Sequence, residues 1–480
     1  MSGPGDAPRA ADGIRTSLTD RLRTLPGLLS GPVDFLRLRR HLYRYSVAQI
    51  RRYQTQEVLD LLAYARAHAP FYRERYKGMD VRSLEDFRKL PVIDKQVMMN
   101  HFDTLNTCGL QLADVMAHAV EKERNRDFLG YYRDAYVVGL SSGTSGNRGI
   151  YVTPKALTRR LPFVFLARGG IPLRLLPFRI LFLLRVFSQG FADINAPFVH
   201  LKYQSTMTPV SEILQAIETG RINILMAPPS LIRLLLPFKD RLARQVRLIM
   251  TYAEVLEIEE KQRFEQVFGA RVIEIYQASE GQIGSACRCG RLHLNEDLVY
   301  VELLDADGNP VTTPGTVASR MLVTNLVNRA QPLIRYEMND LVVLDGPCPC
   351  GSRFRTIDRV LGRNDDVLWL RNAEGAWQHV FPDLVSRWII TSDDNIREFQ
   401  MLQARADALT LRVALLKDGP AERETARSVL VDRFREEMAR FGLAPALDIR
   451  FEDIGQPADK GKYKRFIRTM PAPAAGEPFA

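Results

Sequence analysis

Short strand-like runs alternate with helical segments through the middle of this chain, and this alternation constrains the fold more than any other feature. Apolar runs at 221–226, 248–250 and 272–276 are separated by helical patterns at 231–236 and 257–268. Strands that alternate with helices predict a layered α/β core. Ligands bind such sheets beyond the carboxyl ends of the strands, so the loops there are the first candidates for a functional site.

A loop of glycines and hydroxyl side chains follows another apolar, strand-like run at 136–140. Its sequence is Ser141-Ser142-Gly143-Thr144-Ser145-Gly146-Asn147-Arg148-Gly149. Glycine lets a loop bring backbone N–H groups close to an anion, and hydroxyls add further donors. These groups suit a polyphosphate, although surface turns have a similar composition. A P-loop would have Lys where this chain has Asn147, so that motif is not met. We expect this run to be a buried strand, and we expect its loop and the polar turn at 277–281 to lie beyond the carboxyl ends of strands.

The same segment contains the G-x-S-x-G pattern of the α/β-hydrolase nucleophile elbow, at residues 139–143. That elbow requires a strand, a sharp turn and then a helix. A β-type run at 150–154 follows instead, which weakens the hydrolase interpretation. Ser141 stays an alternative nucleophile, because His293 and His379 lie downstream in the chain order of a hydrolase triad.

Two C-x-C-G motifs indicate a metal site. They are Cys287-Arg288-Cys289-Gly290 and Cys348-Pro349-Cys350-Gly351. Zinc prefers four soft ligands in a tetrahedron, and a tight turn that ends in glycine can point two thiolates at one ion. We expect a structural zinc ion held by Cys287, Cys289, Cys348 and Cys350. His293 is the alternative ligand, most readily in place of Cys289; reduced thiols without metal are the other interpretation.

Length and charge limit the remaining functions. A chain of 480 residues predicts two or three domains, and five cysteines fit a reducing compartment. The net charge of +10 suits an acidic partner or substrate, such as a nucleotide, a carrier protein or anionic lipid. The positive charges are spread widely and no nucleic-acid module is recognisable, so we expect no nucleic-acid partner.

The most apolar stretch, 161–187, is interrupted by Arg168, Arg174, Arg179 and Arg185. Each would cost about 2.5–3.5 kcal/mol near the centre of a bilayer, so we expect no transmembrane segment there. Buried helices and strands whose arginines reach outward to solvent are the main interpretation, and a peripheral membrane or carrier-protein surface is the alternative. Residues 1–13 lack an apolar signal core, so we expect a cytoplasmic protein.

Several segments together resemble, in order, the motif series of adenylate-forming enzymes, the superfamily of acyl-CoA synthetases, luciferases and peptide-synthetase adenylation domains. The segments are 141–149, 276–281, 332–340, 362–366 and 461–465. Residues 90–95 and the second C-x-C-G motif resemble the branch of phenylacetate–CoA ligase, deazaflavin-cofactor adenylyltransferase and capsule-type proteins. The similarity runs from about residue 50 to residue 468.

The resemblance implies a binding site for ATP. The residues that it assigns to ATP or AMP are Ser141, Ser142, Gly143, Thr144, Ser145, Gly146, Arg148, Tyr276, Gln277, Ala278, Ser279, Asp340 and Arg363. The hydroxyls of the loop would bind the β- and γ-phosphates. Tyr276 would stack on adenine or line its pocket, and Asp340 would accept hydrogen bonds from the ribose. Arg363 would contact the ribose or a phosphate near the hinge, where Asp365 lies.

The resemblance also implies the catalytic residues. Glu280 would hold Mg²⁺ against the phosphates, since a carboxylate oxygen is a hard ligand for a hard cation. Lys462 would contact the substrate carboxylate and the α-phosphate and stabilise charge as pyrophosphate leaves. This chain departs from the family pattern at 147–148, 277–278 and 338–339, which leaves the substrate and the second step open.

The implied fold is a large N-terminal α/β region with several subdomains and mixed sheets, plus a small mobile C-terminal α+β domain. We expect an N-terminal extension at 1–45, partly disordered, the large domain at 46–362, the small domain with the catalytic lysine at 363–470, and a disordered tail at 471–480. The small domain would rotate between half-reactions.

The implied reaction has two steps. A carboxylic acid, with an aromatic acid favoured, would attack ATP to give an acyl-adenylate and pyrophosphate, and CoA or a carrier-protein phosphopantetheine would then accept the acyl group. The alternatives are an adenylyltransferase that stops at the AMP adduct or uses a non-thiol acceptor, the α/β serine hydrolase, and a non-catalytic, zinc-stabilised binding protein. An acyl carrier protein as partner and a homodimer both stay open.

Overall fold

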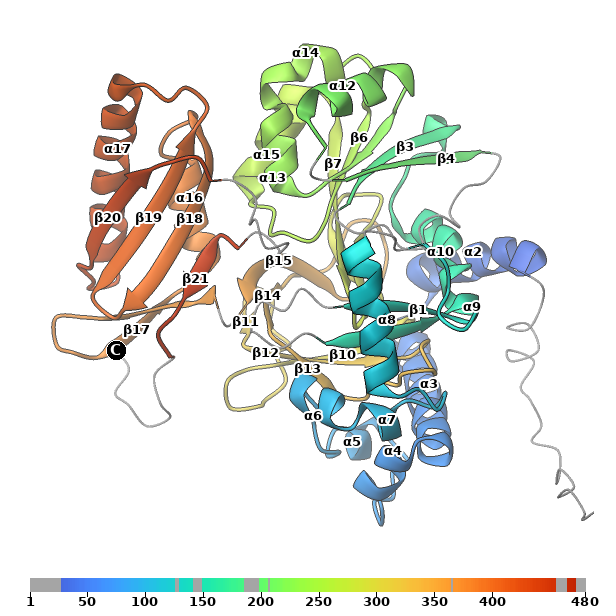
Figure 1. The fold of residues 1–480 in the computed structure, drawn as a ribbon. Coiled ribbons are helices and arrows are strands. Elements are labelled where there is room, and N and C mark those ends of the chain that lie inside the picture. The colour runs from blue at the N-terminus through green and yellow to red at the C-terminus, as the bar shows by residue number, and fades with distance from the viewer. Residues whose placement is uncertain are drawn as a thin grey trace, which may run out of the picture.

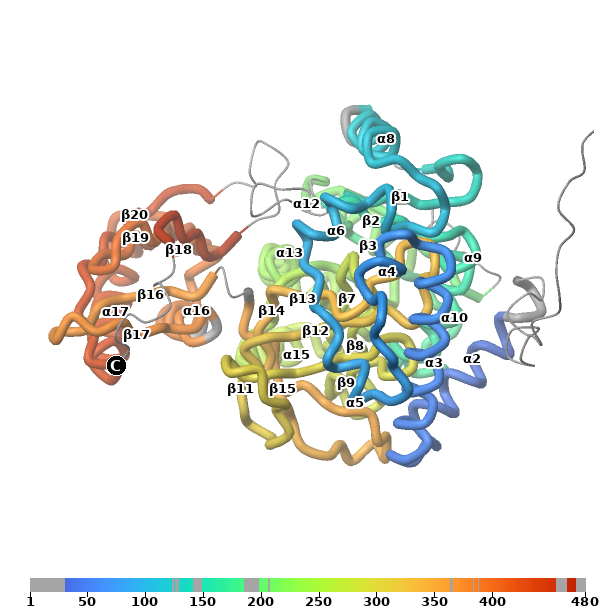
Figure 2. The backbone as a smooth tube through the Cα atoms, turned by 90° about the horizontal axis from the view of Figure 1, so that it is seen from below, coloured from blue at the N-terminus to red at the C-terminus, as the bar shows by residue number. Residues whose placement is uncertain are grey.

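The computed structural model describes residues 27–125, 129–140, 149–184, 198–205, 208–363, 366–454 and 464–471. They form a large body and a smaller C-terminal body beside it (Figures 1 and 2). The large body is built on a mixed sheet, and the small body has its own sheet and core. The expected fold class, a large α/β region with mixed sheets and a small C-terminal α+β domain, is confirmed.

Helices form the N-terminal part of the large body. They are α2 (Gly27–Arg44), α3 (Val47–His68), α4 (Pro70–Arg75), α5 (Leu84–Phe87), α6 (Lys95–Asn100), α7 (Phe102–Leu105) and α8 (Leu112–Asn125). A capping box starts α3, in which Ser46 and Gln49 satisfy each other's backbone N–H groups. Helix α2 packs against α10 (Leu161–Arg168) and buries Leu38 and Leu42, so residues 27–44 of the expected extension belong to the large body.

The segment after α8 forms a hairpin and not a strand of the central sheet. Strands β1 (Tyr136–Leu140) and β2 (Ile150–Pro154) pair antiparallel, with Leu140 opposite Ile150. The expectation of a buried strand at 136–140 is therefore wrong, since no residue of β1 is fully buried and the strand lies in a two-stranded sheet. Among the described residues, strand β2 comes after the loop where the hydrolase elbow requires a helix, which argues against the hydrolase interpretation.

The central sheet has ten strands in the order β11-β14-β15-β9-β8-β7-β6-β5-β3-β4. Its parallel half contains β3 (Phe178–Leu183), β4 (Val199–Gln204), β5 (Ile224–Met226), β6 (Leu248–Thr251) and β7 (Arg271–Ala278). Its antiparallel half contains β8 (Gly281–Ala286), β9 (Leu292–Leu294), β11 (Val317–Ala318), β14 (Asp340–Leu344) and β15 (Thr356–Arg363). Strand β7 is parallel to β6 and antiparallel to β8, so the turn after β7 lies where the sheet changes direction.

Short helices connect and cover the parallel strands. They are α9 (Lys155–Thr158), α10, η1 (Leu173–Leu175), α12 (Val210–Thr219), α13 (Pro229–Leu235), η2 (Leu236–Phe238), α14 (Lys239–Leu242) and α15 (Ile258–Phe268). Helix α15 ends at Gly269, whose φ of 59° is the left-handed conformation that glycine adopts without strain. The helix expected at 257–268 and the strands expected at 248–250 and 272–276 are present.

The apolar stretch at 161–187 contains α10 and β3, as expected, but one of its arginines does not reach solvent. The side chain of Arg168 is 2% exposed and pairs with Asp297, which also accepts a hydrogen bond from His41. The expectation of outward-reaching arginines is wrong at this position, because a distant carboxylate supplies a buried partner. Among the described residues, no helix combines the length and the apolar content needed to cross a bilayer.

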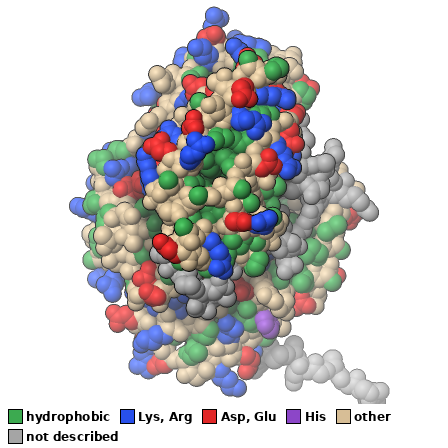
Figure 3. Space-filling view, turned by 90° about the vertical axis from the view of Figure 1, so that its left-hand side faces the viewer, with side chains coloured by type: hydrophobic (Ala, Val, Ile, Leu, Met, Phe, Trp, Pro, Cys, Tyr) green, Lys and Arg blue, Asp and Glu red, His purple; other side chains and the backbone are tan. Residues whose placement is uncertain are grey.

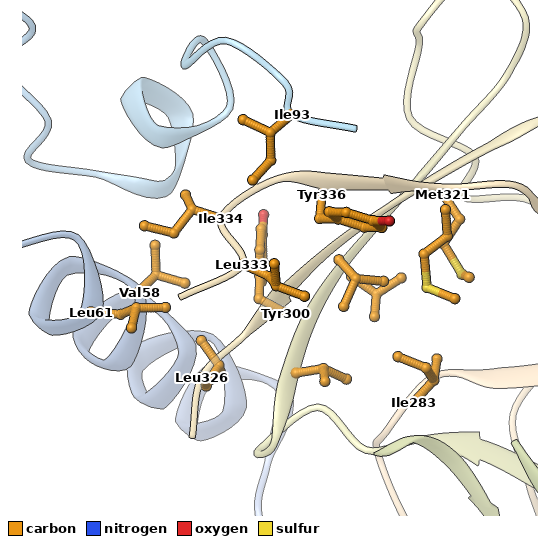
Figure 4. Packing of buried hydrophobic residues seen from close by; sticks show 14 of the residues in the cluster. Val58, Leu61, Ile93, Ile283, Tyr300, Met321, Leu326, Leu333, Ile334 and Tyr336 are labelled. Carbon is orange, nitrogen blue, oxygen red and sulfur yellow. The ribbon is translucent and has the colours of Figure 1, made fainter. Parts of the chain in front are cut away.

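A second, three-stranded sheet completes the large body, in the order β10-β12-β13. Its strands are β10 (Val299–Leu304), β12 (Arg320–Asn325) and β13 (Tyr336–Met338). Figure 4 shows how residues of this sheet pack with Val58 and Leu61 of α3 and with Ile93. The N-terminal helices therefore hold in place the sheet that carries Tyr336.

The small body consists of β16 (Leu368–Arg371), β17 (Trp377–Val380), α16 (Pro382–Ile390), β18 (Ile396–Arg405), β19 (Ala408–Leu415), α17 (Pro420–Ala439), β20 (Ala446–Phe451) and β21 (Phe466–Arg468). Its main sheet has the order β20-β19-β18-β21, and helices α16 and α17 bury Trp388, Leu430 and Phe434 in its core. Lys and Arg side chains are interspersed with Asp and Glu over this side of the molecule (Figure 3).

Candidate active site

Glu280 lies in the turn between β7 and β8, and two tyrosines from other elements lie beside it. The Tyr151 hydroxyl, on β2, donates a 2.7 Å hydrogen bond to Glu280 Oε1. The hydroxyls of Tyr151 and Tyr336 are 3.0 Å apart, and Tyr336 is the first residue of β13. The hairpin that carries the glycine- and hydroxyl-rich loop therefore meets the turn after β7 and the three-stranded sheet at one carboxylate.

Burial, with the nearby Glu280 carboxylate, raises the pKa of both Tyr151 and Tyr336. Each hydroxyl therefore stays protonated near neutral pH, and Tyr151 can act as a donor to the carboxylate. A carboxylate oxygen held in this way is the ligand type that Mg²⁺ prefers.

The backbone of the turn is also fixed. Asn325 Nδ2 donates a 2.7 Å hydrogen bond to the Glu280 carbonyl. A Cβ atom at Gly281 would lie only 3.1 Å from that same Asn325 nitrogen, so glycine permits the close approach. Of the other predicted residues in this segment, Gln277 and Ser279 are exposed, and Ala278 packs against the core.

A second pair of predicted site residues is in direct contact. Tyr276, on β7, donates a 2.7 Å hydrogen bond from its hydroxyl to Asp340 Oδ2. Asp340 begins β14, and its backbone is paired with that of Arg363 on β15. Tyr276, Asp340 and Glu280 are thus grouped around the carboxyl end of β7.

Arg335 joins the segment at 90–95 to the strand that carries Tyr336. Its guanidinium makes two hydrogen bonds of 3.0 Å to the Glu302 carboxylate and a third to the Leu90 carbonyl.

The backbone of Arg335 is also held in place. The Ile93 N–H donates to the Arg335 carbonyl at 3.2 Å, and the Glu337 N–H donates to the Ile93 carbonyl at 2.8 Å. Arg335 adopts a φ of 50°, an unusual value for a residue other than glycine. Its buried ion pair holds the bend after which Tyr336 points toward Glu280.

The cysteine motifs converge on one cluster at the other end of β15. Cys287, His293, Cys348 and Cys350 each offer a ligand atom, and these atoms lie within 4.8 Å of one another. Strand β9 carries His293 and pairs with β15, with Thr356 opposite His293. Since the second motif directly precedes β15, this pairing brings the two motifs together.

The distances within the cluster fit a tetrahedral zinc ion. The sulfurs of Cys287 and Cys348 are 3.6 Å apart, and Cys350 Sγ is 3.5 Å from His293 Nε2. Ligands at ordinary Zn–S and Zn–N distances would be separated by about 3.8 Å and about 3.5 Å in a tetrahedron. The Nδ1 atom of His293 is 3.0 Å from the Phe354 carbonyl, which suits an N–H donor there and leaves Nε2 as a ligand.

Cys289 does not belong to the cluster. Its thiol is exposed, whereas its backbone N–H donates to Cys287 Sγ at 3.3 Å. Burial raises the pKa of Cys287, but hydrogen bonds from His293 and from backbone N–H groups outweigh it and lower this pKa to about 6. Burial raises the pKa of Cys348 to about 12 and also raises that of Cys350. The geometry favours the alternative ligand set, in which His293 takes the place of Cys289.

Some predicted site residues lie outside the described part of the chain. They are Ser141, Ser142, Gly143, Thr144, Ser145, Gly146, Arg148, Asp365 and Lys462, together with the side chain of Arg363. Their assignments stay predictions.

Four residues at this site were not among those predicted from the sequence. Tyr151, Asn325, Arg335 and Tyr336 fix Glu280 or its neighbours. Arg335 and Tyr336 lie within a recognised motif, but Tyr151 and Asn325 show only as polar residues in apolar strands. The two histidines of the hydrolase alternative lie in different parts of the structure. His293 faces the cysteines, and His379 lies on β17 of the small body.

No protein-family model matches the chain, but individual proteins are similar to it. Phenylacetate-coenzyme A ligase of Thermus thermophilus is 26% identical over 420 residues, which are 81% of this chain and 86% of that ligase. Protein CapK of Staphylococcus aureus is 23% identical over 222 residues, 45% of each chain. A crystal structure of 2-hydroxyisobutyryl-CoA ligase in the postadenylation state, with 2-HIB-AMP, matches with a TM-score of 0.70 at 18% identity, covering 89% of this chain and 91% of that chain.

The similarity in sequence to one such ligase and in fold to another supports an adenylate-forming ligase, and the resemblance to that superfamily is confirmed. Within the superfamily, the chain is similar to the phenylacetate–CoA ligase branch, as the motifs at 90–95 and 348–351 predicted.

Proposed function

We propose that this ligase activates a carboxylic acid, with an aromatic acid favoured, as an acyl-adenylate and then transfers the acyl group to the thiol of CoA. The observation that carries this proposal is the meeting of Tyr151, Glu280 and Tyr336 beside the Tyr276–Asp340 pair. The similarity to a phenylacetate–CoA ligase supports the choice of acid and of acceptor.

In the first step, an oxygen of the substrate carboxylate attacks the α-phosphorus of ATP, and the bond to the bridging oxygen of pyrophosphate breaks. Glu280, fixed by Tyr151 and Asn325, would hold Mg²⁺, which neutralises phosphate charge when bound. Asp340 would accept hydrogen bonds from the ribose hydroxyls, and Tyr276 would orient Asp340 through their 2.7 Å contact. The loop at 141–149 would bind the phosphates, and Lys462 would stabilise the charge that develops.

In the second step, the sulfur of CoA attacks the acyl carbonyl, AMP leaves and the thiol proton passes to solvent. A carrier-protein phosphopantetheine offers the same thiol and is the alternative acceptor. An enzyme that stops at the AMP adduct would complete the first step alone.

The proposal is tested by ATP–pyrophosphate exchange with phenylacetate, benzoate, 2-hydroxyisobutyrate and octanoate, followed by thioester formation with CoA. We expect exchange that depends on one acid and falls by about 100-fold or more in Glu280→Gln, since a group that stabilises transition-state charge is lost. The matched control is Glu337→Gln, because Glu337 lies on the neighbouring strand β13 and pairs with Arg320. Failure of every acid to support exchange would contradict the proposal, and exchange without thioester would favour the adenylyltransferase.

We also propose that Cys287, His293, Cys348 and Cys350 hold a structural zinc ion. Three thiols, an imidazole nitrogen and N–H donors to the sulfurs support this set. The set supplies all four ligands of a closed site, as structural zinc sites do. Thiolates that must stay reduced also fit the proposed location in the cytoplasm.

A further inference from the structure

Four charged side chains from the two domains meet in one cluster at the domain boundary. The large domain supplies Arg233 on α13 and Glu260 on α15. The small domain supplies Glu398 on β18 and Arg465, which directly precedes β21. Helix α13 and strand β18 are in contact, and each domain contributes one positive and one negative charge.

Each arginine contacts a carboxylate of each domain. Arg233 Nη2 donates to Glu398 Oε2 at 2.6 Å across the boundary, and Arg233 Nη1 bonds to Glu260 within the large domain. Arg465 Nη2 lies 3.6 Å from Glu260 Oε1 across the boundary, and Arg465 Nε lies 3.3 Å from Glu398 Oε1 within the small domain. The contacts form a closed ring of alternating charge.

The cluster is removed from solvent by the contact between the domains. The side chains of Arg233 and Glu260 are 7% and 2% exposed, and those of Glu398 and Arg465 are 11% and 12% exposed. Buried charges are tolerated only when they are paired, so the loss of one partner leaves the others with an unsatisfied buried charge. The contact between the domains therefore depends on the complete ring.

The ring can also be divided without leaving any of its four members unpaired. If the small domain turns away, Arg233 keeps Glu260 and Arg465 keeps Glu398. The small domain then carries the Glu398–Arg465 pair and the large domain carries Arg233 with Glu260 and the nearby Glu254, and water can solvate both groups. An interface of this kind is specific in its orientation and yet reversible, because hydration of the separated charges offsets part of the free energy needed to open it.

The structure as a whole matches one state of a ligase of similar fold better than another. 2-Hydroxyisobutyryl-CoA ligase gives a TM-score of 0.70 in its postadenylation state and 0.55 in its thioesterification state, with 89% of this chain covered in both. Both comparisons use the same ligase and the same share of this chain, so the structure is more similar to the postadenylation state.

We propose that Arg233, Glu260, Glu398 and Arg465 form a reversible latch that holds the small domain in the orientation for adenylation and that opens for transfer to the thiol. These are positioning residues, and the inference rests on the proposed two-step function. Arg465 follows Lys462 by three positions in the sequence, so the latch also fixes the chain close after the predicted catalytic lysine.

The decisive variant is Arg233→Gln, because it leaves Glu260 and the nearby Glu254 facing Glu398 across the boundary. We expect ATP–pyrophosphate exchange with phenylacetate to fall by about tenfold or more, since truncating one partner of a buried charge pair is costly. Transfer from chemically prepared phenylacetyl-adenylate to CoA should change by less than about twofold or rise, because that step does not need the latch. An equal loss in both half-reactions would overturn the proposal.

The matched control is Arg263→Gln. Arg263 also reaches across the boundary, to Asp394 at 3.2 Å, but the Asp394 side chain is 91% exposed. An exposed pair contributes little, so both half-reactions should stay within about twofold of the wild type. In the double variant Arg233→Gln, Glu398→Gln, exchange should fall by less than the product of the two single losses, because the two residues interact directly. Multiplicative losses would overturn the proposal.

A measurement that needs no activity separates this inference from the proposed function. Hydrogen–deuterium exchange of the free protein should be faster in α13 and β18 of Arg233→Gln than in the wild type, with β6 of the large domain and β19 of the small domain unchanged. Unchanged protection at α13 and β18 would overturn the latch even if the enzyme is active. Faster exchange there would support it even if no acid is activated, in which case only the proposed function fails.

Discussion

The hydroxyl of Tyr151 donates a 2.7 Å hydrogen bond to the carboxylate of Glu280, across 129 residues of sequence. Tyr151 is the second residue of β2, the strand that directly follows the predicted phosphate-binding loop. The bond therefore ties the hairpin that carries this loop to the turn that carries the predicted magnesium ligand. Two parts of the proposed nucleotide site are thus joined by a neutral donor, which adds no charge to the site.

Removal of this hydroxyl tests its importance. In Tyr151→Phe we expect ATP–pyrophosphate exchange to fall by about tenfold, because a hydrogen bond to a charged group contributes ~1.5 kcal/mol or more. Tyr131→Phe is the matched control, since its hydroxyl lies 3.1 Å from Thr158 Oγ1 and away from Glu280. Equal activity of Tyr151→Phe and the control would show that Glu280 does not need this donor.

The buried ion pair between Arg335 and Glu302 should contribute strongly to the free energy of unfolding. In Arg335→Met the Glu302 carboxylate loses both guanidinium hydrogen bonds while staying buried. We expect the free energy of unfolding to fall by ~3–5 kcal/mol, measured by urea denaturation. Arg320→Met removes a comparable pair to Glu337 whose side chains are 37% and 32% exposed, and should cost less than ~1 kcal/mol. Similar losses in both variants would contradict the special position of Arg335.

The proposed zinc ligand set predicts different zinc contents for the variants Cys348→Ser and Cys289→Ser. The wild-type protein should contain about one zinc ion per chain, and Cys348→Ser should lose most of it, because zinc sites need all of their ligands. Cys289→Ser should keep its zinc, since the Cys289 thiol is exposed and outside the cluster. Elemental analysis of the purified proteins gives both values. Loss of zinc in Cys289→Ser, or none in the wild type, would rule out this ligand set.

The Asp297 carboxylate should make the free energy of unfolding depend on pH. Burial raises the pKa of Asp297, but Arg168 and His41 outweigh burial and lower it below the ordinary value. A depressed folded-state pKa means that this carboxylate stabilises the fold above about pH 4 and that the stabilisation is lost as the pH falls through the folded-state pKa.

Asp297→Asn should therefore be less stable than the wild type by ~3 kcal/mol at pH 7, and the difference should shrink on acidification. Urea denaturation at pH 7 and at several lower pH values measures it. Asp358→Asn, at an exposed ion pair with Arg359, should follow the wild-type profile. A constant difference between Asp297→Asn and the wild type at all pH values would contradict the role of the charge.

Local sequence patterns predicted much of the fold correctly. The helix expected at 257–268 is α15, and Gly269 ends it, because propensity and the left-handed conformation of glycine act over a few residues. The C-x-C-G motifs likewise predicted two tight turns, and Gly290 and Gly351 have φ values of 81° and 86°. In both cases the physical cause lies within the segment itself.

The partner of a residue could not be read in the same way. The run at 136–140 has the composition of a central strand, yet it forms a separate hairpin. Arg168 was expected to reach solvent, but Asp297 and His41 come from distant segments to form a buried cluster around it. Strand pairing and buried ion pairs depend on which surfaces meet, and composition does not specify that.

The sequence by itself determined the strand–helix alternation, the turns and the types of chemical group that the chain carries, because each depends on neighbours along the backbone. Only the tertiary structure decided that His293 and not Cys289 faces the other thiols, that Tyr151 holds Glu280, and that Arg233 meets Glu398 across the domains. Each of these contacts joins residues brought together by the pairing of strands or the docking of domains, and their geometry exists only once those surfaces have packed.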